Sequence, residues 1–455
     1  MCISTLNRFS DIATFGFELE FLVYFRESNI TPPLQFKDEK FGRSPQQISE
    51  EPYASVKSGN DDYELHMKRL HYFGREIASK LDEAGIVTVY REKGHPKDGE
   101  TLNVDNLGPT LGSFDEFCYG SYKKSTVVPE ETMIWSDPVN GKRMAVRPET
   151  EDGCFWLGFE FVSKAYRYPD LESMKSELKI ICRTLRANYS VSINAGRDSI
   201  HGSSRCGVHV HWGLSGSEYN LLTVKRVITL MWVAEEMLMT LHATWRRDAR
   251  KYAALLQQGT NMAIDNVSKL PSWIDHLGKG SWSHEMQQNV PTTVQGSLHQ
   301  NKPKAQWIWR AETMDDLVML VGEAVKSRKA SLAITELLPA ASNFTGKSRR
   351  SQLNTIEFRH MQGSLHPALI AAWIEVTAAI MRRCFDMSPR EFTSVLEDVA
   401  ACVADRNSTI GNLLDKLGVA SETSSIFKTF NQQRLDQEAD SKIAVFLPGM
   451  RGVSP

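Results

Sequence analysis

The chain has 455 residues, of which 41% are hydrophobic and 24% are charged, so it can bury a large core. Its formal net charge of −2 argues against the dominant basic surface that nucleic-acid-binding proteins carry. Residues Met1 to Ser10 lack a basic start followed by an apolar run, and the longest apolar stretch, Tyr219–Ala243, contains four charged side chains. We therefore expect no signal peptide, no membrane span and no nucleic-acid partner.

The first predicted strand, Thr14–Tyr24, contains the run Phe-Gly-Phe-Glu-Leu-Glu-Phe, in which apolar and acidic residues alternate. Alternation places Glu18 and Glu20 on one face of the strand and the apolar side chains on the other. Two carboxylates about 7 Å apart on a rigid strand repel each other unless cations or water reach them. Taken alone, the pattern also fits a half-exposed strand with a solvated acidic face.

Strands and helices then follow each other along the chain. Runs rich in β-branched and aromatic residues predict strands, which are Ile86–Tyr90, Thr132–Trp135, Met144–Arg147, Phe155–Ser163, Tyr189–Asn194, Val208–Leu214 and Asn354–Gln362. Helical periodicity and end signals predict helices, which are Asp61–Ala84, Asp170–Ala187, a helix from a capping box at Ser215 and Glu218 to about Leu241, Thr313–Lys326, Pro367–Cys384, one opened by Ser388, and Thr409–Gln437.

Two polar segments interrupt this series and are predicted to be mobile insertions, at residues 28–60 and 261–304. The C-terminal part, residues 367–440, is predicted to be helical. No internal repeat and no linker divides the chain, so we expect a single catalytic domain over residues 1–455.

The seven cysteines are scattered, and no two are spaced as Cys-x-x-Cys. This usage is typical of reduced thiols and predicts a cytoplasmic protein. Cys206, three residues before a histidine, could be a nucleophile beside a base, although cysteine is also a common buried residue.

Three further strands carry polar side chains that suit chemistry. His209 and His211 share one face of their strand, and imidazoles so spaced can bind a metal ion or contact anionic groups. Glu357 and Arg359 share a face of another strand, where alone they would form an ordinary ion pair. Glu160 is an acidic position among the aromatic residues of Phe155–Ser163.

Together these strands offer four carboxylates, two imidazoles and one guanidinium group. Carboxylate ligands suit Mg²⁺ or Mn²⁺, and four of them suit two ions better than one. Divalent ions beside an arginine are what the handling of a nucleoside triphosphate requires. The sequence contains no P-loop and no Gly-x-Gly-x-x-Gly motif, which argues against those two nucleotide-binding folds.

Four motifs occur in a fixed order: Gly-Phe-Glu-Leu-Glu-Phe at 16–21, Gly-Phe-Glu-Phe-Val-Ser at 158–163, Gly-Val-His-Val-His-Trp-Gly at 207–213 and Ile-Glu-Phe-Arg-His-Met-Gln-Gly-Ser-Leu at 356–365. In combination they resemble the fungal-type amidoligase family of the carboxylate–amine ligase superfamily, to which glutamine synthetase and glutamate–cysteine ligase belong. The resemblance implies an α+β fold like the catalytic fold of glutamine synthetase. In that fold, a curved antiparallel sheet holds the active site on its concave face and helices pack behind it. The chain departs from the family at Ser163-Lys164, where Ser-Pro is common.

The resemblance also implies residue roles and cofactors. ATP and Mg²⁺ or Mn²⁺ would be the cofactors, and a small-molecule or peptide carboxylate and an amine would be the substrates. The implied metal ligands are Glu18, Glu20, Glu160, His209 and Glu357. The implied contacts to ATP are Arg359 and His209 and, in the second rank, Arg246 and Arg247, and the implied catalytic residues are Arg359 and His211.

The implied reaction has two steps, in which a carboxylate attacks the γ-phosphate of ATP and an amine then displaces phosphate from the acyl phosphate. Two alternatives stay open at this point. One is a metal-dependent hydrolase that uses the same Glu/His cluster without a nucleotide. The other is a non-catalytic binding protein built on a ligase fold.

Overall fold

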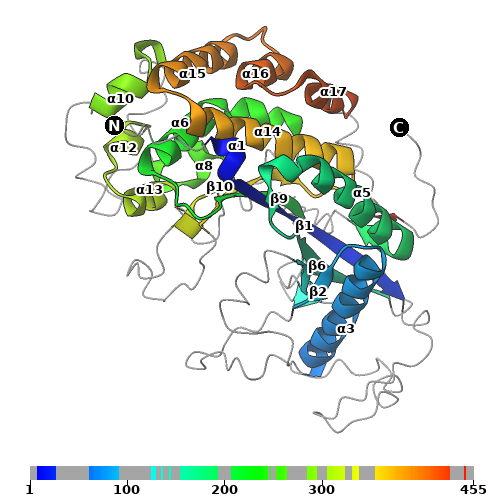
Figure 1. Ribbon diagram of the computed structural model, residues 1–455. Coiled ribbons are helices and arrows are strands. Elements are labelled where there is room, and N and C mark those ends of the chain that lie inside the picture. Colours follow the sequence, from blue (N-terminus) through cyan, green and yellow to red (C-terminus); the bar gives the residue numbers. More distant parts are fainter. Residues whose placement is uncertain are drawn as a thin grey trace. The chain divides into compact units, whose positions relative to one another are not determined.

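The computed structural model of the protein describes residues 8–26, 61–91, 124–129, 135–136, 143–144, 154–192, 206–243, 246, 253–263, 284–294, 305–322, 330–337, 354–430 and 445–446. Its contacts group the chain into two compact units (Figure 1). The first unit consists of Met1–Leu19, Ala165–Lys179 and His201–Lys442, and the second of Glu20–Lys164, Ile180–Ile200 and Ile443–Pro455. The division falls inside strand β1 (Ala13–Arg26) rather than at a linker. No feature of the sequence marks this position, and we had expected a single domain.

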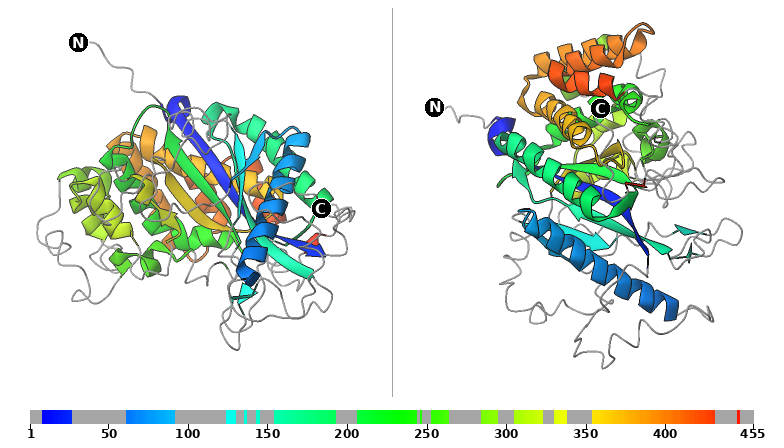
Figure 2. Two further views of the ribbon diagram at one scale, coloured as in Figure 1. Left: turned by 90° about the horizontal axis from the view of Figure 1, so that it is seen from below. Right: turned by 90° about the vertical axis from the view of Figure 1, so that its right-hand side faces the viewer.

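The first unit is built on an antiparallel sheet in the order β10–β11–β9–β1. Its strands are β10 (Leu332–Ala333), β11 (Ile356–Gln362), β9 (Gly207–Leu214) and the start of β1, which also pairs with β7 (Tyr166–Arg167). Figure 2, on the left, shows β1, β9 and β11 side by side with helices behind them.

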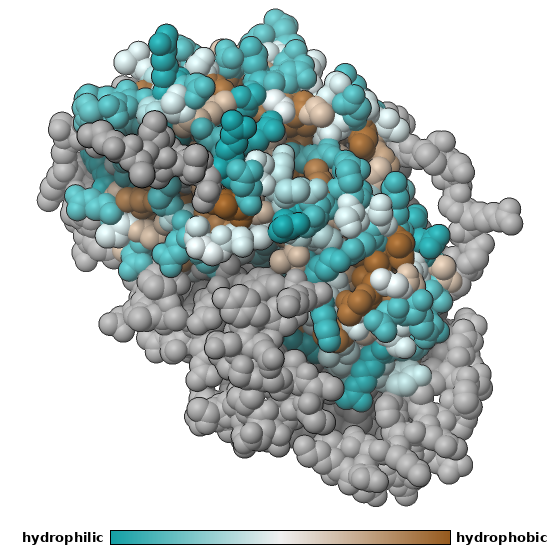
Figure 3. Space-filling view, viewed as in Figure 1, coloured by the Kyte–Doolittle hydropathy of each residue, from teal (hydrophilic) through white to brown (hydrophobic). Residues whose placement is uncertain are grey.

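Helices cover one face of this sheet. The two that lie in the middle of the layer are α14 (Pro367–Asp386) and α6 (Leu221–Leu238), which pack on each other (Figure 1). Around them lie α1 (Phe9–Ile12), the first half of α5 (Leu171–Asn188), α8 (Leu256–Gly259), α10 (His284–Asn289), α12 (Ala305–Arg310), α13 (Met314–Val321), α15 (Pro389–Ala404), α16 (Ile410–Leu417) and α17 (Ser421–Thr429), with short 3-10 turns at Tyr168–Asp170, Met239–Leu241, Asn261–Ala263 and Thr335–Leu337. The outward face over α15, α16 and α17 is mainly hydrophilic in Figure 3, as expected for an outer layer.

Aromatic residues join the sheet to the helices. Trp212 of β9 is fully buried, contacts the Phe15 ring at 5.0 Å, and donates a hydrogen bond from its indole nitrogen to Thr377 of α14 at 3.0 Å. Burying a large apolar side chain stabilises a fold by roughly 2–3 kcal/mol. Because successive side chains of a strand point to opposite faces, this packing turns His209 and His211 to the face away from α14.

The second unit contains the rest of β1 and its own strands and helix. Its elements are α3 (Asp61–Glu83), β2 (Thr88–Tyr90), β3 (Ser125–Pro129), β4 (Trp135–Ser136), β5 (Arg143–Met144), β6 (Cys154–Val162), β8 (Ser190–Ser192) and β12 (Val445–Phe446). In the sheet, β6 lies between β1 and β3, β3 pairs with β2, and β8 pairs with both β1 and β12. The β2–β3 pair is parallel, so the expectation of a wholly antiparallel sheet was wrong at this edge.

Most predicted elements occur in the expected order, with several differences. The elements that were not predicted are the strands β3, β7, β10 and β12 and the short helices α1, α8, α10 and α12. The predicted helix Thr409–Gln437 is divided into α16 and α17. The predicted insertion at 28–60 lies outside the described residues, as does most of 261–304. Helix α6 begins at Leu221, and its cap is Asn220, whose side chain accepts a hydrogen bond from the Thr223 amide at 2.8 Å. The predicted cap, Ser215, instead donates its amide hydrogen to the Ile12 carbonyl at 2.7 Å and so continues the strand pairing.

The described residues hold four free cysteines, Cys182, Cys206, Cys384 and Cys402, all buried. Burial raises the pKa of the Cys182 thiol to about 12 and raises that of Cys384 as well. Cys206 has no exposed surface, which does not favour a nucleophilic role. None of the described helices is long and apolar enough to cross a membrane.

Candidate active site

Three adjacent strands of the first unit bring five of the predicted site residues together. Glu18 lies on β1, His209 and His211 lie on β9, and Glu357 and Arg359 lie on β11. The strand register places Glu18 opposite His209 and Glu357 opposite His211. Directly opposed side chains on one face of a sheet are close neighbours, so the register itself assembles the cluster.

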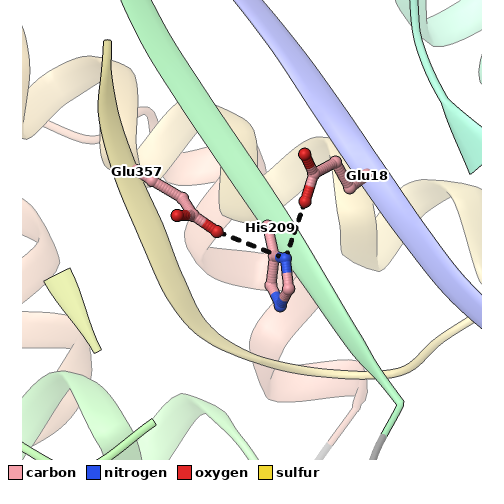
Figure 4. Close-up of side chains that lie close together, drawn as sticks. All are labelled: Glu18, His209 and Glu357. Atoms are coloured by element: carbon pink, nitrogen blue, oxygen red, sulfur yellow. Dashed lines mark hydrogen bonds and ion pairs between the residues drawn. The ribbon is translucent and has the colours of Figure 1, made fainter. Parts of the chain in front are cut away.

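The centre of the cluster is the His209 ring, which lies between two carboxylates (Figure 4). Its Nδ1 atom is 2.8 Å from a carboxylate oxygen of Glu18 and 3.3 Å from one of Glu357. Ionised carboxylates only accept hydrogen bonds, so Nδ1 carries the ring proton and donates a hydrogen bond to Glu18. The side chain of His209 is 3% exposed, which means that this proton sits between two carboxylates in a space that water hardly reaches.

The second histidine, His211, also contacts the carboxylate of Glu18. His211 Nε2 lies 3.0 Å from the other Glu18 oxygen and 3.9 Å from Glu357, and its Nδ1 lies 3.4 Å from the Thr355 hydroxyl. Burial by itself would lower the pKa of His211, but the charge of Glu18, its hydrogen bond and the charge of Glu357 outweigh burial and raise the pKa to about 9. His211 is therefore an imidazolium near neutral pH in this metal-free arrangement.

Both carboxylates stay ionised in spite of their burial. Burial alone would raise the pKa of Glu18, but the His211 charge and the hydrogen bonds from both histidines hold that pKa well below its usual value. Burial would likewise raise the pKa of Glu357, and the charges of Arg359, His211 and His209 lower it instead. Arg359 donates a short hydrogen bond to Glu357 from its guanidinium group.

The donor set fits a divalent cation. One ligand atom each from Glu18, His209 and Glu357 lies within 4.8 Å of the others, and two of these separations are 2.8 and 3.3 Å. Neighbouring ligands of an octahedral cation with bonds of about 2.1 Å stand about 3 Å apart, so the observed spacing matches. The Nδ1 proton of His209 occupies the position between the two carboxylates that such a cation would take.

Four other residues were predicted to belong to the site. Glu20 and Glu160 are half-buried on β1 and β6 and belong to the second unit, so their role as metal ligands stays a prediction. Arg246 is 1% exposed and donates to the backbone carbonyls of Arg359 at 2.7 Å and His360 at 3.3 Å, which does not favour direct contact with ATP. Arg247 lies outside the described residues.

Two contacts of the site were not predicted from the sequence. The Thr355 hydroxyl beside His211 precedes β11, and nothing in a lone threonine marks it as a site residue. His360 lies inside the fourth motif, but its fully buried side chain contacts Glu235 of α6, a partner that no sequence spacing connects to it.

Comparisons with known proteins agree with the motifs. Residues 11–381 match the family described as "putative amidoligase enzyme". The chain belongs to this amidoligase family. No curated protein matches the chain.

Among solved structures, the crystal structure of a bifunctional glutathione synthetase from Pasteurella multocida matches this chain with 10% sequence identity and a TM-score of 0.27. The match covers 95% of this chain and 49% of the glutathione synthetase, so the chain spans about half the length of that protein.

The charge state of His211 predicts how stability depends on pH without metal. Its pKa is raised from 6.5 to about 9 on folding, so its contribution is fully present below about pH 6.5 and is lost as pH rises to about 9. The loss is at most about 3 kcal/mol. Urea unfolding in the presence of a chelator between pH 6 and 9 measures it. The variant His211→Gln should show a much flatter profile, and an equal slope in both proteins would contradict the assignment.

The predicted role of Glu20 as a metal ligand can be tested by substitution. Glu20→Gln keeps the shape of the side chain and removes the charge that would hold a cation, so we expect it to abolish ATP turnover without unfolding the protein. Circular dichroism and ATP-dependent phosphate release together check this. Near-normal activity with Mg²⁺ would remove Glu20 from the ligand set.

Proposed function

We propose that this amidoligase is an ATP-dependent carboxylate–amine ligase that forms an amide bond through an acyl phosphate and requires Mg²⁺ or Mn²⁺. The observation that carries the proposal is the buried Nδ1 atom of His209 between the carboxylates of Glu18 and Glu357, the second of which pairs with the Arg359 guanidinium. Membership of the amidoligase family supports the ligase class.

Within this proposal, Glu18, His209 and Glu357 hold a divalent cation. The cation would supply charge that offsets the negative charge on the phosphates of ATP. Arg359 lies next to Glu357 and is placed to contact the phosphoryl group while it moves from ATP to the substrate carboxylate. A guanidinium suits this role because its planar fork of donors matches phosphate oxygens.

The proposed role of His211 follows from its position. Its Nε2 atom lies 3.0 Å from Glu18 and 3.9 Å from Glu357, so the ring stands beside two of the proposed metal ligands. There His211 would donate a hydrogen bond to developing negative charge or accept the proton of the attacking amine.

The proposal includes a fold like that of the glutamine synthetase catalytic domain, with the site on the concave face of a curved sheet. It is supported by the position of the cluster on the sheet face away from α14, because the helices that pack behind the sheet occupy the opposite face. The substrates would be a small-molecule or peptide carboxylate and an amine, neither of them nucleic acid.

A substrate search tests this proposal. Protein, ATP and Mg²⁺ are incubated with a metabolite extract, and mass spectrometry looks for a product lighter by one water than the sum of two consumed compounds. ADP and phosphate should form in step with that product. An ATP-independent product would refute the ligase.

The second candidate is a metal-dependent hydrolase, and one observation favours it. The three ligands Glu18, His209 and Glu357 form a compact mixed nitrogen and oxygen set for one cation, which also suits activation of a water molecule. A hydrolase needs no nucleotide, so cleavage of an amide in the extract without ATP would favour it over the ligase.

A further inference from the structure

Strand β11 pairs out of step with β9 at one point. Phe358 lies opposite Val210 and Met361 lies opposite Val208, so three steps along β11 match two along β9. Two residues of β11, Arg359 and His360, therefore lie opposite the single residue His209 of β9. This arrangement is a β-bulge. Alternation places Arg359 on the site face with Glu357, and the extra residue brings Met361 to the buried face beside Val208.

A bulge interrupts the ladder of backbone hydrogen bonds. At this bulge, a buried guanidinium donates hydrogen bonds to the strand backbone. Arg246 donates from Nη2 to the Arg359 carbonyl at 2.7 Å and from Nε to the His360 carbonyl at 3.3 Å. These are the carbonyls of the two bulged residues. Because buried carbonyls need partners, Arg246 stabilises this backbone conformation over a regular strand.

A buried carboxylate holds the same segment from the helix side. Glu235 of α6 is 1% exposed and accepts hydrogen bonds from His360 Nε2 at 3.0 Å, from the Leu256 amide at 2.6 Å and from the Ser331 hydroxyl. Three donors compensate this carboxylate for its loss of water. The burial of Glu235 in α6 therefore has a specific structural reason.

Two residues that contact Glu235 are also direct neighbours of Arg359. The hydroxyl of Ser331 donates a hydrogen bond to Glu235, and the backbone carbonyl of Ser331 accepts one from the Arg359 amide at 2.7 Å. His360, which Glu235 holds by its ring, is the next residue along the chain. The backbone of Arg359 is thus fixed at its amide through Ser331 and at its carbonyl through Arg246.

We propose that Glu235, His360 and Arg246 are positioning residues that lock the β11 bulge and thereby set where Glu357 and Arg359 stand in the site. The inference rests on the proposed function only because the groups it positions are the proposed metal ligand and phosphate contact. A purely structural role would stabilise the protein without changing the metal site, so the two roles give different measurements.

The first test compares two buried histidines that pack on the same tryptophan. His360 and His242 lie with ring centres 5.6 and 4.6 Å from that of Trp373, but only His360 belongs to β11. His360→Phe keeps the ring and removes the hydrogen bond to Glu235, and His242→Phe is the matched control. We expect His360→Phe to weaken Mn²⁺ binding, measured by electron paramagnetic resonance, by about 10–100-fold, and His242→Phe to leave it unchanged.

A second measurement needs no metal. Hydrogen exchange read by mass spectrometry on a peptide containing residues 356–362 should become faster in His360→Phe and stay as in the parent protein in His242→Phe. Equal effects of both variants on Mn²⁺ binding and on this peptide would overturn the proposal. If the parent protein itself binds no Mn²⁺, the proposed function fails, and the exchange data alone decide the positioning role.

Arg246→Lys provides a milder variant and separates two roles for this arginine. A lysine can donate to one of the two carbonyls but cannot bridge both in a fixed plane. A positioning role predicts faster exchange of the 356–362 peptide and weaker Mn²⁺ binding together. Weaker ATP binding with unchanged exchange and unchanged Mn²⁺ binding would instead identify Arg246 as a direct phosphate contact and overturn its positioning role.

Discussion

Replacing Glu357 by glutamine is expected to weaken Mn²⁺ binding by at least about 100-fold, because the amide keeps the shape of the side chain and loses the charge. The same change removes the carboxylate that pairs with Arg359, whose side chain is 10% exposed. Removing one partner of a buried ion pair costs about 3–5 kcal/mol of stability. The metal-free variant should therefore also unfold at lower urea concentration.

A matched control separates the two effects. Glu285 pairs at 2.7 Å with Lys225, whose side chain is 4% exposed, and neither residue is in the cluster. Glu285→Gln should lower stability and leave Mn²⁺ binding unchanged. If Glu357→Gln binds Mn²⁺ as the parent protein does, Glu357 is not a metal ligand and the proposed centre is wrong.

Replacing Arg359 by lysine is expected to lower the rate of ATP-dependent phosphate release by about 1,000-fold. Lysine keeps the positive charge but cannot present two parallel donors to phosphate oxygens or to Glu357. Mn²⁺ binding should change by no more than a few fold, because lysine leaves all three proposed ligands in place. Rates of phosphate release in the extract assay, beside an Mn²⁺ titration, measure both effects.

The control for this change is Arg382→Lys, which alters an exposed arginine of α14 in the same way. It should release phosphate at the parent rate. A rate for Arg359→Lys close to that of the control would mean that the guanidinium of Arg359 does not contact the transferring phosphoryl group.

The pairing of site residues along each strand could be predicted because it is local. Alternation alone placed Glu357 beside Arg359 and His209 beside His211 on their strand faces, and the structure keeps both pairs on one face. The apolar residues that alternate with them identify the buried face, since Trp212, next to His211, packs against α14. These properties need only the two-residue period of a strand and the cost of exposing apolar surface.

Which pairs meet is a property of the tertiary structure. The order β11–β9–β1 joins strands that lie far apart in the sequence, and its register sets Glu18 opposite His209. A shift by one residue would turn every side chain to the other face, so the cluster depends on packing that no single segment contains. The assignment of Glu20 and Glu160 as ligands depends on the same kind of information and stays a prediction.

The sequence by itself therefore determined the strands that carry the site, most of the long helices and the polar faces of those strands, because these follow from short-range periodicity and chain stereochemistry. Only the tertiary structure decided the rest. It placed the cap of α6 at Asn220, because the Ser215 amide still donates to the carbonyl of Ile12, the residue before β1. It also buried Arg246 behind the bulge at Arg359, where its guanidinium donates to the carbonyls of Arg359 and His360, because buried carbonyls need donors and no local pattern shows which part of the chain supplies them.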